Sequence, residues 1–251
     1  MTTAVLLKIY DGIARITLNR PDRLNAFDAE MAEDWAQVTR VAVNSSEVNA
    51  ILVNAAGRAF CAGGDVRSMA ELEDRGAAMS RLAQLINEGI LHLVESSKPV
   101  VAAAQGATAG GGLGILLASD YAVIEASSKV GSLYAGVGLT PDLSVSAQLA
   151  RAVGERRALQ LVLQERMLNA DESVEWGIAA EKVEDGEALG RAEAIAAQWV
   201  ENAHAYGEAK RLIRSQPTRS FRDQLAEEAR TIGAASITPQ GDKRIRAFAS
   251  R

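Results

Sequence analysis

Two glycine clusters, each placed directly after a short apolar run, constrain this chain more than any other feature. Residues 57–66 read Gly-Arg-Ala-Phe-Cys-Ala-Gly-Gly-Asp-Val and follow the apolar run at 50–54. Gly63 and Gly64 permit a tight turn and a close approach of another molecule to the backbone. A helical pattern begins at Val66, so this segment predicts a strand, a turn and a helix.

The second glycine cluster repeats this arrangement. Residues 98–106 form another strand-like apolar run, and Ala-Gly-Gly-Gly-Leu-Gly at 109–114 leads into an apolar helix. The first N–H groups of a helix have no partner within it and carry the positive end of its dipole. Two such junctions can each direct one backbone donor at the same oxygen, which would stabilise negative charge developing on a carbonyl. The alternative is that each cluster only turns a corner.

Composition narrows the classes of function. The net charge is −5 and no run of lysine or arginine is present, so nucleic-acid binding is not expected. No apolar run reaches the roughly 20 residues that span a bilayer, and no signal peptide is recognisable, so we expect no membrane association and a cytoplasmic location. A single cysteine, Cys61, and two histidines argue against a disulfide, a metal site and a Ser-His-Asp triad.

Strands and helices alternate over the first 183 residues, which predicts βα repeats in one α/β body. Strands are expected at 5–10, 13–18, 50–54, 99–105, 121–125 and 129–131, and long helices after Asp28 and over 75–94. From residue 188 the patterns are helical only: 188–201, 203–213, 220–234 and 240–249. We therefore expect a core over 1–195 and a C-terminal helical region over 196–251.

Several ordered motifs resemble the crotonase (enoyl-CoA hydratase/isomerase) superfamily. They are Leu-Asn-Arg-Pro at 18–21 with Asn-Ala-Phe at 25–27, both glycine segments, the stretch 170–177 and Ile-Arg-Ala-Phe at 245–248. The resemblance covers essentially the whole chain. It implies a spiral of ββα units, followed by a helical region that packs homotrimers or dimers of trimers. It also implies acyl-CoA substrates and no metal or redox cofactor, coenzyme A being part of the substrate.

The resemblance further implies how the substrate is held. The thioester oxygen would accept hydrogen bonds from the backbone N–H groups of Gly64 and Gly111. The candidate substrate-binding residues are Arg23, Ala26, Ala62, Asp65, Val66, Tyr134 and Phe248. Three of them have a plainer alternative: a solvated charge for Arg23, a helix cap for Asp65 and an anchor of the last helix for Phe248. As a substrate-binding residue, Phe248 would close the acyl pocket of a neighbouring subunit.

At both catalytic positions the chain departs from the hydratases that it resembles. Those enzymes use two glutamates, because water addition needs one group to activate water and another to deliver a proton. The corresponding residues here are Gly114 and Tyr134, and neither can be a carboxylate base. Tyr134 would either hydrogen-bond the substrate or fill the space of the missing glutamate.

One carboxylate, Asp142, remains near the second cluster. Gly-Leu-Thr-Pro-Asp at 138–142 is similar to the loop of the family's isomerases, in which one Asp or Glu moves a proton between carbons. Burial would raise its pKa from about 3.9 and help it to hold that proton. Alternatively, Asp142 caps the next helix.

These observations favour an enoyl-CoA isomerase with Gly64, Gly111 and Asp142 as catalytic residues. Two alternatives stay open at this point. One is an enoyl-CoA hydratase, a lyase, that uses non-standard catalytic groups. The other is an oligomer that binds acyl-CoA without catalysis.

Overall fold

A six-stranded sheet forms the centre of the computed structural model, which describes residues 3–250. Its strands, in spatial order, are β1 (Val5–Tyr10), β2 (Ile13–Leu18), β3 (Ala50–Ala55), β4 (Val100–Ala104), β6 (Tyr121–Glu125) and β9 (Glu181–Val183). β1 and β2 are antiparallel, and the other neighbours are parallel. The expected hairpin is confirmed: Asp11 and Gly12 both have positive φ, as a tight two-residue turn requires.

A smaller sheet contains β5 (Ala107–Ala109), β7 (Lys129–Gly131) and β8 (Met167–Leu168). The chain alternates between the two sheets, since β4 is followed by β5 and then by helix α4 (Gly111–Ala118), and β6 is followed by β7. This alternation produces the expected spiral of ββα units. The sequence did not predict β5, β8 and β9, because runs of two or three residues are too short to show a strand pattern.

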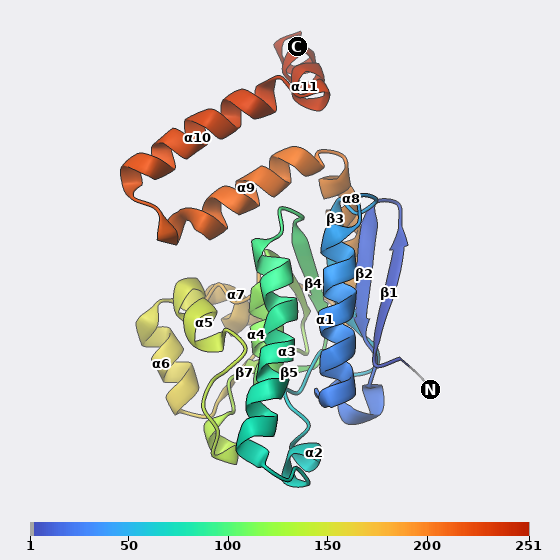
Figure 1. The fold of residues 1–251 in the computed structure, drawn as a ribbon, viewed down its shortest axis with the longest axis vertical. Helices are drawn as coiled ribbons and strands as arrows, with labels where there is room; N and C mark the ends of the chain where they lie inside the picture. The colour runs from blue at the N-terminus through green and yellow to red at the C-terminus, as the bar shows by residue number, and fades with distance from the viewer. Residues whose placement is uncertain (1–2, 251) are drawn as a thin grey trace.

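Helices cover both faces of the large sheet (Figure 1). The pair α1 (Ala29–Asn44) and α3 (Arg75–Glu95) packs on one face, where Ile51 and Val53 join their core. The opposite face receives α8 (Ala188–Val200), which packs on Ala50 and Leu52. Adjacent residues of β3 thus face opposite layers, as expected for a parallel strand buried on both sides.

Short helices and loops surround this core. They are η1 (Pro21–Arg23), α2 (Val66–Ala70), η2 (Ala135–Val137), α5 (Val145–Val153), α6 (Glu155–Leu163) and α7 (Ala170–Glu175). The C-terminal part contains α9 (Ala203–Ser215), η3 (Gln216–Thr218), α10 (Phe221–Ser236) and α11 (Pro239–Ala249). In Figure 1, α9 lies across one end of the body, and α10 and α11 extend away from it. The expected division at residue 195 falls within α8, and the division itself stays a prediction.

Two cations of α9 connect this helix to the core. The buried Lys210 donates from Nζ to the carbonyl of Leu93 in the last turn of α3 (2.6 Å) and pairs with Asp120 at 3.0 Å. Arg214 donates to the carbonyl of Ser119, just after α4 (2.8 Å), and also pairs with Asp120 at 3.0 Å. Positive charge at the C-terminal ends of α3 and α4 complements their dipoles.

Candidate active site

The two glycine clusters meet in the folded chain. Gly63 has a φ of 101°, and a Cβ built on it would lie 3.1 Å from the Ala109 carbonyl oxygen and 3.3 Å from the Gly111 nitrogen. A hydrogen bond from Ala109 N–H to the Cys61 carbonyl (2.9 Å) holds the two segments side by side. Glycine is therefore required at position 63 by both backbone conformation and space.

Two backbone N–H groups at this junction are free to bind a ligand. The Gly64 turn is fixed on either side, because Phe27 N–H donates to the Gly63 carbonyl and Asp65 N–H donates to the Phe27 carbonyl, both at 2.8 Å. Within residues 3–250, neither Gly64 N–H nor Gly111 N–H donates to another residue. Gly111 is the first residue of α4, where the helix dipole favours negative charge.

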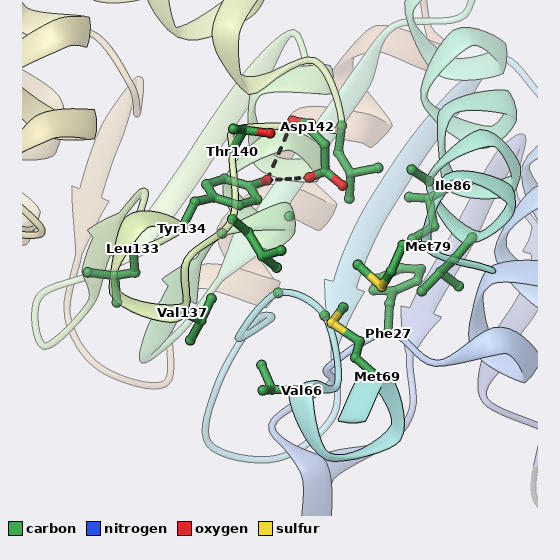
Figure 2. A pocket seen from close by; sticks show the side chains of 18 of the residues that line it. Phe27, Val66, Met69, Met79, Ile86, Leu133, Tyr134, Val137, Thr140 and Asp142 are labelled. Atoms are coloured by element: carbon green, nitrogen blue, oxygen red, sulfur yellow. Dashed lines mark hydrogen bonds between the residues drawn. The ribbon is translucent and has the colours of Figure 1, made fainter. Parts of the chain in front are cut away.

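Both glycines line one cavity of about 430 Å³. Figure 2 shows its two sides: the apolar side chains of Phe27, Met69, Met79 and Ile86 on one, and Tyr134 and Asp142 on the other. Among residues 3–250, Asp142 is the single carboxylate that lines this cavity. The arrangement can bind an apolar acyl group, with polar groups concentrated at one end.

Tyr134 and Asp142 form a hydrogen-bonded pair. The Tyr134 hydroxyl donates to Oδ1 of Asp142 at 2.6 Å, which leaves Oδ2 outside this bond (Figure 2). Burial raises the pKa of Asp142, and the hydrogen bond from Tyr134 opposes this only in part. Burial and the nearby carboxylate raise the pKa of Tyr134 as well, so this phenol stays protonated and acts as a donor.

The alternative role of Asp142 as a helix cap is wrong. The cap residue of α5 is Ser144, and no side chain bonds the N-terminus of that helix. Val145 N–H donates to the backbone carbonyl of Asp142 (2.9 Å), while the carboxylate lines the cavity.

The space beside Gly114 is filled by the backbone of Leu143. A Cβ built on Gly114 would collide with the Leu143 carbonyl oxygen, and one built on Gly111 would lie 2.5 Å from Leu143 Cδ1. Leu143 and Ser144 reach this position with φ of 47° and 66°, a left-handed conformation that costs about 1–2 kcal/mol per residue. Sequence reasoning missed Leu143, because its residue type gives no signal of this conformation.

Comparison with known proteins decides the family. The family model described as enoyl-CoA hydratase/isomerase matches residues 8–249. This chain belongs to the enoyl-CoA hydratase/isomerase family. A trans-2-decenoyl-[acyl-carrier-protein] isomerase from Streptococcus mutans is 34% identical over 176 residues, 69% of this chain and 67% of the relative. A short-chain-enoyl-CoA hydratase from Clostridium acetobutylicum is 32% identical over 200 residues, 79% of this chain and 76% of the relative.

The fold is that of the same family. A crystal structure from Mycobacterium abscessus, of a protein provisionally assigned as an enoyl-CoA hydratase/isomerase, superposes with a TM-score of 0.94 at 30% identity. The superposition covers 98% of this chain and 96% of the other. The crotonase-like fold expected from the motifs is therefore confirmed.

In the present structure, two further candidate residues, Ala62 and Val66, line the same cavity as Gly64 and Gly111. Asp65 instead caps α2: its carboxylate accepts from Ser68 N–H at 3.3 Å and pairs with Arg20 at 3.2 Å. Asp65 therefore does not line the cavity that contains Gly64 and Gly111; it lines a neighbouring cavity instead.

Three other candidates lie outside this cavity. Ala26 is buried, and its carbonyl accepts a hydrogen bond from Arg20. Arg23 is exposed at the end of η1, and Phe248 is 77% exposed on α11. Their roles in binding coenzyme A or a neighbouring subunit's substrate stay predictions.

Two other expectations concern metals and cysteine. Among residues 3–250, no group of three or more His, Cys, Asp or Glu is arranged to hold a metal ion, and none of the helices is both long and apolar enough to cross a membrane. Cys61 is fully buried, and burial raises the pKa of its thiol to about 12, so it is a core residue.

Proposed function

We propose that this protein is an enoyl-CoA isomerase that shifts a double bond with Asp142 as its one base. The observation that carries this proposal is the placement of a single carboxylate in a cavity that also holds two free backbone donors, Gly64 and Gly111. An isomerisation needs one group that takes a proton and returns it, whereas hydration needs two.

The proton and the electrons balance without a cofactor. Asp142 removes a proton from C2 of a 3-enoyl thioester, and the electron pair of that C–H bond moves into a dienolate. The thioester oxygen carries the negative charge and accepts hydrogen bonds from Gly64 and Gly111, each worth about 10²–10³ in rate. The protonated Asp142 then returns the proton to C4, which yields the 2-enoyl thioester.

Tyr134 supports Asp142 in this scheme. Its hydroxyl holds Oδ1 and so orients Oδ2 for proton transfer. The raised pKa of Asp142 suits a base that must hold a proton while the dienolate exists.

Two observations favour isomerisation over hydration. The Leu143 carbonyl fills the space beside Gly114, so a second carboxylate cannot stand there without a backbone shift. The Streptococcus mutans relative is named a trans-2-decenoyl-[acyl-carrier-protein] isomerase, which supports isomerisation of a linear enoyl thioester. The Clostridium acetobutylicum relative is named as a hydratase, so hydration is the outcome that the test must distinguish.

We also propose that the chain assembles as a homotrimer or a dimer of trimers. Large apolar side chains are exposed along the extended C-terminal helices: Phe221, Ile232, Ile237, Ile245 and Phe248 are 55–82% exposed. Several large apolar side chains exposed on neighbouring helices support an interaction surface there.

The test is incubation with 3-enoyl- and 2-enoyl-CoA in deuterated water, with products resolved by mass spectrometry. A moved double bond, with no mass change except exchanged deuterium, is expected. A gain of water would establish the hydratase instead. Binding of the thioester without conversion of any enoyl-CoA would favour the non-catalytic oligomer.

A further inference from the structure

A second cavity lies beside the catalytic one. It measures about 560 Å³ and is enclosed by the start of α1, by α2 and by the first half of α3. Its apolar lining comes chiefly from Ala29, Leu72, Ala78 and Leu85. Nothing in the proposed proton transfer uses this space.

Among residues 3–250, three side chains line both cavities: Phe27, Met69 and Leu82. Phe27 is 1% exposed and packs edge-on against Trp35, with ring centroids 6.1 Å apart, so it cannot move readily. Leu82 extends from the long helix α3 and packs against the core. Met69 differs, because it stands on the five-residue helix α2 and is only half-buried.

The end of the Met69 side chain lies directly against a proposed oxyanion donor. A Cβ built on Gly64 would collide with Met69 Cε, so this methyl group lies against the glycine, on a side chain that lines both cavities. Methionine is unbranched and has three rotatable bonds, which lets it change conformation at small cost. A rotation of Met69 would therefore join the two cavities.

Side chains from the first half of α3 line this second cavity as well as the first. The helical pattern Met79, Leu82, Leu85 predicts core positions, but the fully buried residues of α3 begin only at Ile86. The earlier apolar side chains are only partly buried against the core, and they also line the two cavities. An apolar wall that faces a cavity favours an apolar ligand.

Charge at the rim of the second cavity restricts the ligand further. The rim carries four carboxylates, Asp28, Glu30, Glu33 and Asp65, and one cation, Arg81. Arg20 pairs with both Asp28 (2.6 Å) and Asp65 (3.2 Å), whereas Glu30 and Glu33 have no ion-pair partner among residues 3–250. Like-charge repulsion thus disfavours a ligand whose far end is a carboxylate.

We propose that the second cavity binds the distal carbons of a linear, uncharged acyl chain, and that Met69 moves aside to let the chain pass. This rests on the proposed function in one respect: the thioester lies at Gly64 and Gly111. Each methylene that enters the second cavity should tighten binding about fourfold, or about 0.8 kcal/mol.

Binding of saturated thioesters tests the proposal without requiring turnover. Dissociation constants of butanoyl-, octanoyl- and dodecanoyl-CoA would be measured by calorimetry on the wild-type protein and on Leu72→Trp, which fills the second cavity alone. We expect affinity to rise with chain length in the wild type. In Leu72→Trp, the ratio of dodecanoyl to butanoyl affinity should fall about tenfold or more. Leu163→Trp, an exposed site on α6, is the matched control and should keep the wild-type ratio.

Two outcomes would overturn the proposal. One is affinity that does not rise beyond butanoyl-CoA in the wild type. The other is a chain-length ratio that stays unchanged in the filled variants. Ala78→Leu provides a second filled variant should Leu72→Trp fail to fold. Hexanedioyl-CoA should bind more weakly than hexanoyl-CoA, and equal affinity would contradict the assigned charge preference. A failed isomerase assay would leave these binding results intact, so the two proposals fail separately.

Discussion

The carbonyl oxygen of Leu143 lies against the α-carbon of Gly114, in the space that any side chain at position 114 would need. Leu143 directly follows Asp142. The absence of a side chain at position 114 of α4 therefore makes room for the segment that places the Asp142 carboxylate in the cavity. A chain with a glutamate at position 114 would have to place the 142–144 segment elsewhere.

Replacing Gly114 by alanine should displace this segment. The added Cβ meets backbone rather than a flexible side chain, so we expect a loss of about 1–3 kcal/mol in the free energy of unfolding. Turnover should fall about hundredfold, because the base moves with the segment. Gly190→Ala on the exposed face of α8, where no atom lies within 4 Å of the new Cβ, should instead stabilise by about 0.5–1 kcal/mol. Denaturant unfolding measures the change in stability, and enoyl-CoA turnover measures the change in activity. If Gly114→Ala changed neither, the Leu143 carbonyl could not lie against position 114.

Replacing Asp142 by asparagine should abolish turnover but not weaken the fold. Burial raises the pKa of Asp142 in the folded protein, so its ionised form opposes folding once the pH exceeds the ordinary value of about 3.9. Asp142→Asn should therefore be as stable as the wild type, or more stable, at pH 7. This advantage should shrink as the pH falls toward about 4, where the carboxyl becomes protonated in both the folded and the unfolded state, and should be absent below that pH. Thermal unfolding across pH checks it, and a marked loss of stability at pH 7 would point to a structural role.

Replacing Tyr134 by phenylalanine should change the pH dependence of catalysis. The Tyr134 hydroxyl stabilises the ionised form of Asp142, so its removal raises the pKa of Asp142 further. The acidic limb of the kcat/KM profile should then move up by about one pH unit. Tyr10→Phe, a half-exposed control on β1, should leave the profile unchanged. If Tyr134 only fills space, the limb will not move.

Replacing Ile232 by glutamate should weaken self-association. Ile232 is 72% exposed on α10, and Leu163 is 74% exposed on α6. A charge in the proposed interface should shift the protein toward monomer, whereas Leu163→Glu should leave assembly unchanged. Sedimentation velocity distinguishes these outcomes, and an unaltered oligomer in Ile232→Glu would exclude α10 from the interface.

Elements with strong local chemistry were predictable from the sequence. Asp28 accepts from Met31 N–H at 3.0 Å and begins α1 as expected. Asn169 and Glu172 form the expected capping box of α7. Each of these caps joins residues only three positions apart, so the local sequence is enough to predict it.

The cavities were not predictable in the same way. Met79 and Leu82 follow the pattern of a buried helix face, and periodicity cannot distinguish packing against protein from lining a space. The left-handed conformation of Leu143 likewise depends on α4, which packs on it from about 30 positions earlier in the chain. The resemblance of its loop to that of the family's isomerases identified Asp142 as a candidate. Its hydrogen bond with Tyr134 could be seen only in the folded structure.

Helix α4 has eight residues and is about 12 Å long, and its two ends make different contacts. At its N-terminal end, the Gly111 N–H lies at the cavity. Just beyond its C-terminal end, Arg214 of α9 donates a hydrogen bond to the carbonyl of Ser119. The proposed oxyanion donor and the C-terminal helices are thus connected through a single short helix. If the chain assembles as proposed, a subunit contact that moved α9 along the axis of α4 would change the distance between Gly111 and a bound thioester oxygen, so assembly would alter the proposed catalytic geometry.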